Sequence, residues 1–416
     1  MRSGLVIPAV VVLVLTTVAA AAQNSADASL PAQVTLDQVL TIMNARSPRT
    51  AADRAAIAVA EADRITAQTL PNPSVSYGGA HLLSGLSTGA VTQHQIVLDQ
   101  PLLVSHQRAA REAEADLNLA ASRARVDQTL AERRVTVRQA FATLLSRQQQ
   151  LEVSQQSLAD LERVLQVVRV RADAGERSRY DVARVETETE ALRVGIMNAE
   201  AEVEDAAGQL ATLLGLPGWS PRAIGTLAPS DVPTESNQLW DIATTHRPAL
   251  VALRQQQAAS RGGIVLARRE RLPVPVLSGG AQLTQDVTGT SAVFGLSLPL
   301  PVFDKNQGAI AKAEAQLNAD VLALTAELEE AHAEVDRAAK LLRARREALT
   351  RLEGGVVQRV PVLRQMAEDA YREGSGDILD LLDAMRSQRT IQLSHVQQLE
   401  SVTLAEETVR AVTGLD

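Results

Sequence analysis

Two aspartates three residues apart are the clearest candidates for chemistry in this sequence. Asp380 and Asp383 stand in the segment DILDLLDA, directly after the turn signal GSG. Residues three apart lie on one face of a helix, so both carboxylates point the same way. Copied threefold around an axis, they would form two stacked rings of negative charge, and such rings select cations in narrow pores. An aspartate near a helix start is also commonly a cap or a dipole partner, and this alternative stays open for Asp377 and Asp181.

The other residue types that carry chemistry form no constellation. The six histidines lack the spacing of metal ligands, and we expect ordinary surface or interface positions for them. They are His81, His94, His106, His246, His332 and His395. The sequence has no phosphate-binding glycine loop, no nucleophile elbow and no cysteine, which excludes disulfides and thiolate metal sites. We therefore expect neither an enzyme nor a bound cofactor.

Two segments 200 residues apart are closely similar. VLDQPLLVSHQRAAREAEADLN aligns with SLPLPVFDKNQGAIAKAEAQLN, which places Pro101 opposite Pro301. The period is far longer than that of a solenoid repeat. We therefore expect a tandem duplication inside one intertwined domain, with a first repeat over 23–217 and a second over 218–416.

The composition indicates an elongated helical protein. Only 2% of the 416 residues are aromatic, and the abundance of Ala, Leu, Val, Gln, Glu and Arg is typical of long helices packed in coiled-coil seams. The formal net charge of -8 argues against nucleic acid as a partner. After the N-terminus there is no run of 18 or more apolar residues, so membrane insertion would need β-strands closed into a barrel.

Residues 1–22 predict a secretory signal peptide. They combine a basic start at Arg2, an apolar run from Leu5 to Val18 and a small-residue cleavage pattern near Ala22. The alternative, a membrane-spanning helix, needs about 20 apolar residues, and this run is shorter. Without a cysteine to carry a lipid, we expect a signal-peptidase product in an exported compartment.

Each repeat predicts a short helical pair, then a β-hairpin, then a long helical hairpin. The short helices are expected at 36–46, 48–69, 238–246 and 248–271. The β-hairpins are expected at about 72–100 and 274–300, with weak alternation, and an ordinary soluble hairpin remains the alternative. The long helical hairpins are expected at about 106–214 and 306–413.

Leucines and valines seven residues apart predict a coiled-coil seam in each long helical hairpin. In the second repeat this seam runs through Leu342, Val356 and Leu363. The pair Gly354-Gly355 and Pro361 interrupt the outgoing helix there, and a local kink and a hinge are both open interpretations.

Four strands cannot close a membrane barrel, because the smallest barrels need eight. Open strand edges are not tolerated in lipid, so several chains must pool their strands. Two chains would give eight strands around an interior filled by side chains, whereas three would give twelve strands with room for a channel. The long helices would pool into a tube that continues the barrel.

The whole mature chain resembles the TolC-like outer-membrane factors, the trimeric exit ducts of tripartite efflux and secretion systems in Gram-negative bacteria. The duplication, LPNP and LPVP before the strands, and the tips GERSRYDVARVE and YREGSGDILDLLDA carry this resemblance. The segment PLPVFDKNQGAIAKAEA is most similar to sequences of the heavy-metal cation efflux branch, the CzcC-like and CusC-like members. The resemblance implies a mainly α fold with a small β part, completed in a homotrimer as a twelve-strand β-barrel and a twelve-helix α-barrel.

The resemblance also implies a passive duct in the bacterial outer membrane that extends into the periplasm. Its partners would be outer-membrane lipid, a periplasmic adaptor and an inner-membrane pump of the RND type, with heavy-metal cations as cargo. A multidrug or type I secretion channel is the alternative. A periplasmic coiled-coil adaptor or scaffold is a further alternative of another class, although an adaptor would usually have one helical hairpin between β-rich domains.

The resemblance assigns roles to individual residues. Asp380 and Asp383 would form the periplasmic gate, with Asp181 and Tyr371 as its latch, and this chain has Gly376 where related sequences can carry a latch arginine. The tips expected to dock the adaptor contain Gly175, Ser178, Gly374 and Gly376. The joints between strand and helix, where Pro301 would end a strand and Asn306 would cap a helix, contain Pro101, Pro301, Asn306 and Gln307.

Overall fold

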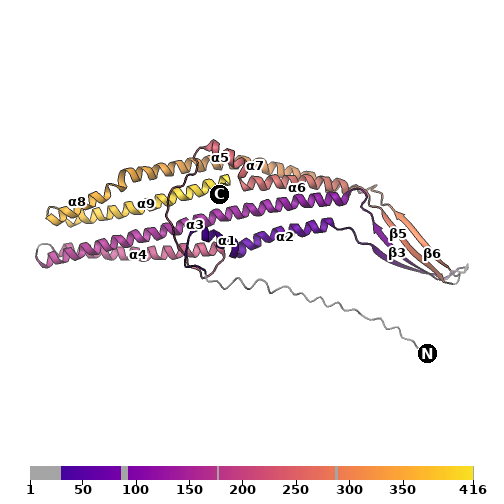
Figure 1. Cartoon of the computed structure of the whole chain (residues 1–416), viewed down its shortest axis with the longest axis horizontal. Helices are drawn as coiled ribbons and strands as arrows, with labels where there is room; N and C mark the ends of the chain where they lie inside the picture. The colour runs from indigo at the N-terminus through magenta and orange to yellow at the C-terminus, as the bar shows by residue number, and fades with distance from the viewer. Residues whose placement is uncertain (1–29, 86–91, 176–177, 286–288, 416) are drawn as a thin grey trace, which may run out of the picture.

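The computed structural model describes residues 30–85, 92–175, 178–285 and 289–415, and the predicted signal peptide lies outside these ranges. The chain forms an elongated body with a sheet at one end and long helices that run away from it (Figure 1). The two halves of the chain run side by side along this body. Within the described ranges, no helix is long and apolar enough to cross a membrane.

The order of long elements is the same in both halves of the chain. The first half contains β1 (Gln33–Val34), α1 (Leu36–Arg46), α2 (Pro48–Gln68), β2 (Ser74–His81), β3 (Thr92–Pro101), α3 (Gln107–Asp173) and α4 (Arg179–Leu214). The second half contains β4 (Arg222–Ala223), α5 (Ser236–His246), α6 (Pro248–Glu270), β5 (Val276–Gln285), β6 (Gly289–Ser297), α7 (Gln307–Leu352), a π-helix (Glu353–Val357), α8 (Val360–Glu373) and α9 (Ile378–Thr413).

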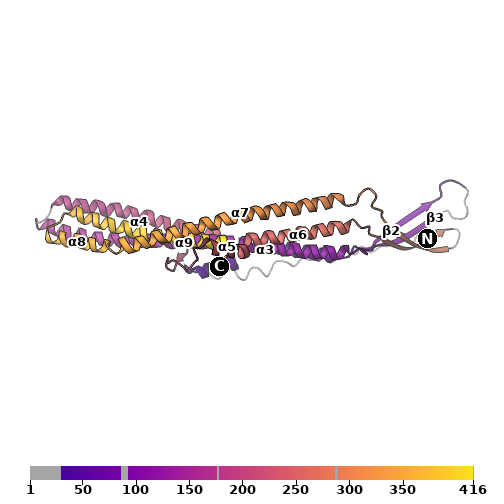
Figure 2. The ribbon, with the colours of Figure 1, turned by 90° about the horizontal axis from the view of Figure 1, so that it is seen from above.

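Helix α3 is the central rod of the molecule. It runs for 67 residues without a break, which corresponds to about 100 Å. Helices α2, α4, α6 and α9 all pack against it and follow its length in Figure 1. Figure 2 shows the same body from above, with α4 and α9 toward the tips and α6 toward the sheet. On the predicted seam of α3, Val137 and Leu144 are fully buried and Leu165 is nearly so.

The outgoing helix of the second repeat is broken where the paired glycines stand. Helix α7 passes directly into the π-helix. Pro361 lies in the first turn of α8, where a backbone N–H would have no partner within the helix, so the N–H that proline lacks is not missed. A π-helix has more residues per turn than an α-helix, so the seven-residue seam changes phase here. The predicted seam is right for Leu342, which is buried, and wrong for Val356 and Leu363, which are exposed.

The four longer strands form one antiparallel sheet in the order β2-β3-β5-β6. Directly opposite residues share a face, so the pairing sorts the side chains into an apolar and a polar face. The apolar face exposes Val75, Tyr77, Ile96, Leu98, Leu277, Leu283, Phe294 and Leu296. The polar face contains Ser76, Gln95, Asp99, Ser278, Gln282 and Ser291. The sorting is a trend and not a strict alternation, because the apolar face also contains His94, Gln100 and Gln285 and the polar face also contains Val97, Val276 and Val293.

Gly280 is a tight point of this sheet. A Cβ added there would overlap the carbonyl oxygen of Ile96, whereas a Cβ at the neighbouring Gly279 would meet nothing within 4 Å. We predict that Gly280→Ala weakens the β3–β5 pairing by about 1–3 kcal/mol, because a backbone atom cannot move aside easily. Gly279→Ala is the matched control and should leave the pairing intact. Amide hydrogen exchange along β3 measures the effect, and equal exchange in the two variants would contradict the clash.

Candidate functional site

The predicted gate aspartates lie on the exposed side of α9. Ile378, Leu381 and Leu382 are buried in an apolar cluster that includes side chains of α3 and α4, whereas Asp380 and Asp383 are exposed. The helix is thus anchored by its apolar side, and both carboxylates point away from the contact between the two hairpins. Their role as a gate stays a prediction.

Asp380 also takes part in the cap of α9. The N–H of Ile378 donates to Asp377 Oδ1 at 2.6 Å, and the N–H of Asp377 donates to Asp380 Oδ2 at 3.4 Å. This capping box satisfies N–H groups at the helix start and puts negative charge at the positive end of the helix dipole. The cap interpretation is therefore confirmed for Asp377, and Asp380 combines a cap with an exposed carboxylate.

Tyr371 is held where the two repeats meet at the helical tips. It is 4% exposed and belongs to the same apolar cluster as Leu165 and Val168 of α3. Arg171, also on α3, donates to the carbonyl oxygens of Tyr371 at 3.2 Å and Arg372 at 3.0 Å. Its guanidinium carbon lies 5.9 Å from the centre of the Tyr371 ring, within the range of a cation–π contact. Arg171 therefore ties the first helical hairpin to the end of α8.

The turn at Gly376 leaves little room for the arginine that related sequences can carry. A Cβ there would lie 3.0 Å from Ala370 Cβ and 3.2 Å from the Ala370 carbonyl carbon. The turn is this tight because the N–H groups of Ser375 and Gly376 both donate to the Ala370 carbonyl oxygen, at 3.0 and 2.9 Å. Gly374 precedes them in the left-handed conformation, with φ of 78°. In this chain Arg171 of α3 instead donates to the carbonyl oxygens of Tyr371 and Arg372, which directly precede this turn.

The first helical tip has a similar construction. Gly175 is also left-handed, with φ of 78°, and residues 176–177 of this tip lie outside the described ranges. Ser178 is the N-cap of α4, and its Oγ accepts the N–H of Tyr180 at 3.0 Å. Asp181 follows in the first turn and is 9% exposed. The latch role of Asp181 and the adaptor-docking role of both tips stay predictions.

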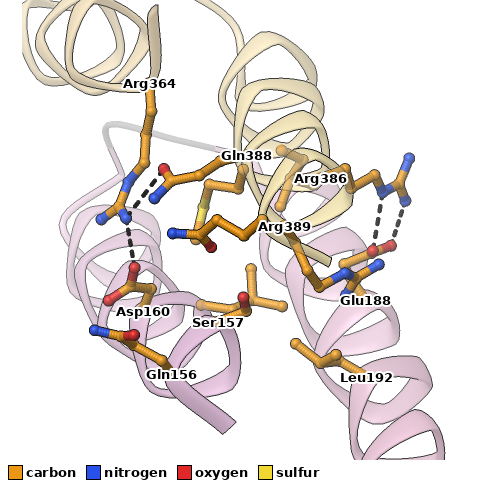
Figure 3. A pocket seen from close by; sticks show the side chains of 13 residues that line it. Gln156, Ser157, Asp160, Glu188, Leu192, Arg364, Arg386, Gln388 and Arg389 are labelled. Carbon is orange, nitrogen blue, oxygen red and sulfur yellow. Dashed lines mark hydrogen bonds and ion pairs between the residues drawn. The ribbon is translucent and has the colours of Figure 1, made fainter. Parts of the chain in front are cut away.

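Two inter-repeat ion pairs hold the helical hairpins together farther from the tips (Figure 3). Glu188 on α4 pairs at two points with Arg386 on α9, and Arg386 Nε lies 2.9 Å from Glu188 Oε1. Asp160 on α3 pairs with Arg364 on α8. A cavity of about 90 Å³ lies among these side chains, and Arg389 also lines it. In each pair the acid belongs to the first repeat and the arginine to the second.

The Glu188–Arg386 pair is stable at neutral pH. The hydrogen bond from Arg386 lowers the pKa of Glu188 below its ordinary value, against the opposing effect of partial burial, and the charge of Arg389 adds to the lowering. A carboxylate with a lowered pKa in the folded state stabilises that state above its unfolded pKa, and this stabilisation is lost as the pH falls through the folded pKa. The pair therefore breaks only in acid, at a pH below the ordinary pKa of a glutamate.

The two strand-to-helix joints share one backbone geometry. His106 and Asn306 are left-handed, with φ of 61° and 57°, and Gln107 and Gln307 then begin α3 and α7. Each glutamine Oε1 accepts the backbone N–H two residues earlier, at 3.0 and 2.7 Å. Asn306 occupies the predicted cap position, but the predicted capping bond is wrong. Its side chain donates to the carbonyl oxygen of Ala267 at 2.8 Å instead.

The prolines of the joints occupy different positions. Pro101 is the last residue of β3. Strand β6 already ends at Ser297, so Pro301 lies in the loop that follows and does not end the strand as predicted. The reason is Pro299, which lacks a backbone donor and comes first.

The sequence predictions missed the inter-repeat contacts of Arg171, Glu188 and Asp160. The residues in these contacts are separated by 200, 198 and 204 positions, close to the offset of the duplication. A search for opposite charges near that offset would have found the two ion pairs.

Among the described residues, no group of three or more His, Asp or Glu side chains could hold a metal ion.

Comparison with solved structures identifies the fold. The chain matches the structure of CusC, solved in work on folding and transmembrane channel formation, with a TM-score of 0.73 at 16% identity over 91% of each chain. This likeness, together with the helices and the small sheet, confirms the predicted mainly α, TolC-like fold.

Sequence comparison identifies the family. The pyoverdine export outer membrane protein OpmQ of Pseudomonas putida is 25% identical over 277 residues, which are 63% of this chain and 59% of OpmQ, less than two thirds of its length. The cobalt-zinc-cadmium resistance protein CzcC of Cupriavidus metallidurans is 23% identical over 323 residues, 76% of this chain and 75% of CzcC. The family model described as outer membrane efflux protein matches residues 39–216 and 239–415, once in each repeat. The chain belongs to the outer membrane efflux protein family.

Proposed function

We propose that this chain is one subunit of a homotrimeric duct in the bacterial outer membrane. The observation that carries the proposal is the sheet, which has an exposed apolar face and two edge strands, β2 and β6. An exposed apolar face of this extent suits lipid, and in lipid an edge strand must find a partner. Three such sheets would close a barrel of twelve strands with room for a channel.

The helical hairpins would continue this barrel as a twelve-helix tube in the periplasm. The tips lie at the opposite end of the body from the sheet (Figure 1). In a trimer the exposed Asp380 and Asp383 would form two rings of acids at this end and act as the gate. The contacts of Arg171 with the end of α8 would hold the gate closed, with Tyr371 and Asp181 in the latch. The tips would then dock a periplasmic adaptor.

We infer that the cargo is a heavy-metal cation delivered by an inner-membrane pump of the RND type. The similarity to CzcC, a cobalt-zinc-cadmium resistance protein, supports this inference, and acidic rings suit cations. The similarity to OpmQ, a pyoverdine export protein, favours a small organic cargo as the second candidate.

A soluble periplasmic adaptor or scaffold is the rival proposal from another class. A soluble protein of this class would not be expected to expose large apolar side chains on a sheet, whereas Val75, Phe294 and Leu296 are 71%, 84% and 71% exposed. In water such a face would promote aggregation. The requirement for detergent during extraction from membranes separates the two proposals directly.

Removal of the acidic rings should open the duct. In a planar bilayer we expect the purified wild type to give small, cation-selective conductance steps, because negative rings narrow the mouth and attract cations. Asp380→Ala combined with Asp383→Ala should enlarge the steps and remove most of the selectivity. If neither protein conducts and extraction needs no detergent, the duct is ruled out in favour of the scaffold.

Loss of an inter-repeat ion pair should favour the open gate. Glu188→Gln cannot pair with the charge of Arg386, and a partly exposed ion pair contributes about 0.5–1 kcal/mol. One pair corresponds to a rise of about two- to fivefold in the occupancy of large conductance steps, and we expect at least this rise because the proposed trimer loses three pairs. Glu190→Gln is the matched control, because Glu190 pairs with Arg193 on its own helix. The wild type should show the same rise only in acid, below the ordinary pKa of a glutamate, because the pKa of Glu188 is lowered in the folded chain. Equal behaviour of the two variants would argue against a role of the Glu188–Arg386 pair in holding the gate closed.

A further inference from the structure

Of the charged residue types Asp, Glu, Lys and Arg, the four long strands contain a single residue, Asp99. The strands read SVSYGGAH, TQHQIVLDQP, VLSGGAQLTQ and GTSAVFGLS, whereas 22% of the whole chain is charged. Excluding charge from a lipid-facing wall is expected, because a charged side chain in lipid is costly. This cost applies only to the face that meets lipid, so the role of Asp99 depends on which face of the sheet contains it.

The pairing of the strands places Asp99 on the polar face of the sheet. Asp99 lies opposite Ser74 on one side and Ser278 on the other. Its neighbours in β3, Leu98 and Gln100, belong to the other face, where Leu98 is 48% exposed. The carboxylate thus points to the side that lines the interior when the apolar face meets lipid.

The charge of Asp99 is not neutralised by the described residues. Ser278 Oγ donates a hydrogen bond to Asp99 Oδ1 at 2.5 Å, which fixes the carboxylate across the β3–β5 pair. No ion pair of Asp99 with Arg, Lys or His occurs in the described part of the chain. This contrasts with the helical body, where acids such as Glu188, Asp160 and Glu406 are paired with arginines.

We propose that Asp99 is a specificity-determining residue of the duct, forming a ring of three carboxylates that favours cations inside the barrel. The inference rests on the proposed trimeric duct and deepens it. Twelve strands about 4.8 Å apart and tilted by about 40° give a backbone radius of about 12 Å. An inward carboxylate then lies about 10 Å from the axis, one Debye length at 0.1 M salt.

The expected strength of this ring follows from its distance to the axis. At 0.1 M salt, three unit charges about 10 Å away raise the ratio of cations to anions on the axis about fourfold. At 1 M salt the Debye length is about 3 Å, and the effect almost disappears. The ring therefore sets a preference for cations over anions and does not bind one metal.

The test measures ion selectivity in the trimer with its tip rings removed. The background is the double variant Asp380→Ala and Asp383→Ala. In this variant, the reversal potential in a KCl gradient around 0.1 M reports the cation-to-anion permeability ratio of the barrel. We expect Asp99→Asn to reduce the cation-to-anion permeability ratio about fourfold and to have no effect around 1 M salt. Ser278→Ala keeps the charge and removes the hydrogen bond, so the ratio should stay near that of the background.

The outcomes separate this inference from the proposed duct. If the background conducts and Asp99→Asn leaves the ratio unchanged at low salt, the ring is overturned and the duct stands. If Ser278→Ala lowers the ratio as much as Asp99→Asn, the carboxylate acts through the sheet structure, and the charge ring is also overturned. If the background does not conduct at all, the duct itself fails and the ring fails with it.

Discussion

The arrangement of the molecule depends on α3 remaining one uninterrupted helix. A helix of 67 residues gains most of its stability from packing rather than from intrinsic propensity. Its partners follow one another along the rod: α2 and α6 on the part near the sheet, α4 and α9 on the part near the tips. Because all four partners are fixed to the same rod, the sheet and the tips hold a defined separation, and a break in α3 would uncouple them.

The two repeats share their joints and differ where they meet. The left-handed residues His106 and Asn306, each followed by a glutamine that accepts the N–H two residues earlier, show that the helix start is copied, although the strands end at different distances from it. Toward the tips, the first repeat supplies Asp160 and Glu188 to inter-repeat ion pairs with arginines of the second. Elsewhere along α3 the direction is reversed, because Arg111 pairs with Glu270 and Arg138 with Glu407. The contact between the repeats is therefore complementary in charge, with acids and arginines supplied from both sides.

Much of the fold could be predicted from the sequence because its signals are local. The lack of Pro and Gly across α3 and the proline at each start of α2 and α6 set helix bounds close to those observed. The phase change after the π-helix could not be predicted, since the seven-residue pattern continues through Val356 in the sequence although the helix turns that residue outward. The contacts of Arg171 were also hidden, because its acceptors are backbone carbonyl oxygens, which any residue type provides.

Charge is distributed in this chain according to what each part must contact. The helical body is rich in ion pairs, and inter-repeat pairs such as Glu188–Arg386 hold helices in register. One face of the sheet has mostly hydroxyl, amide and small side chains, and the other has most of the large apolar side chains. A wall of this kind offers a passing solute few strong contacts, so in the proposed duct the choice of cargo falls to the pump and the adaptor. The strands can still distinguish cations from anions, because an electrostatic potential acts across a wide lumen without direct contact.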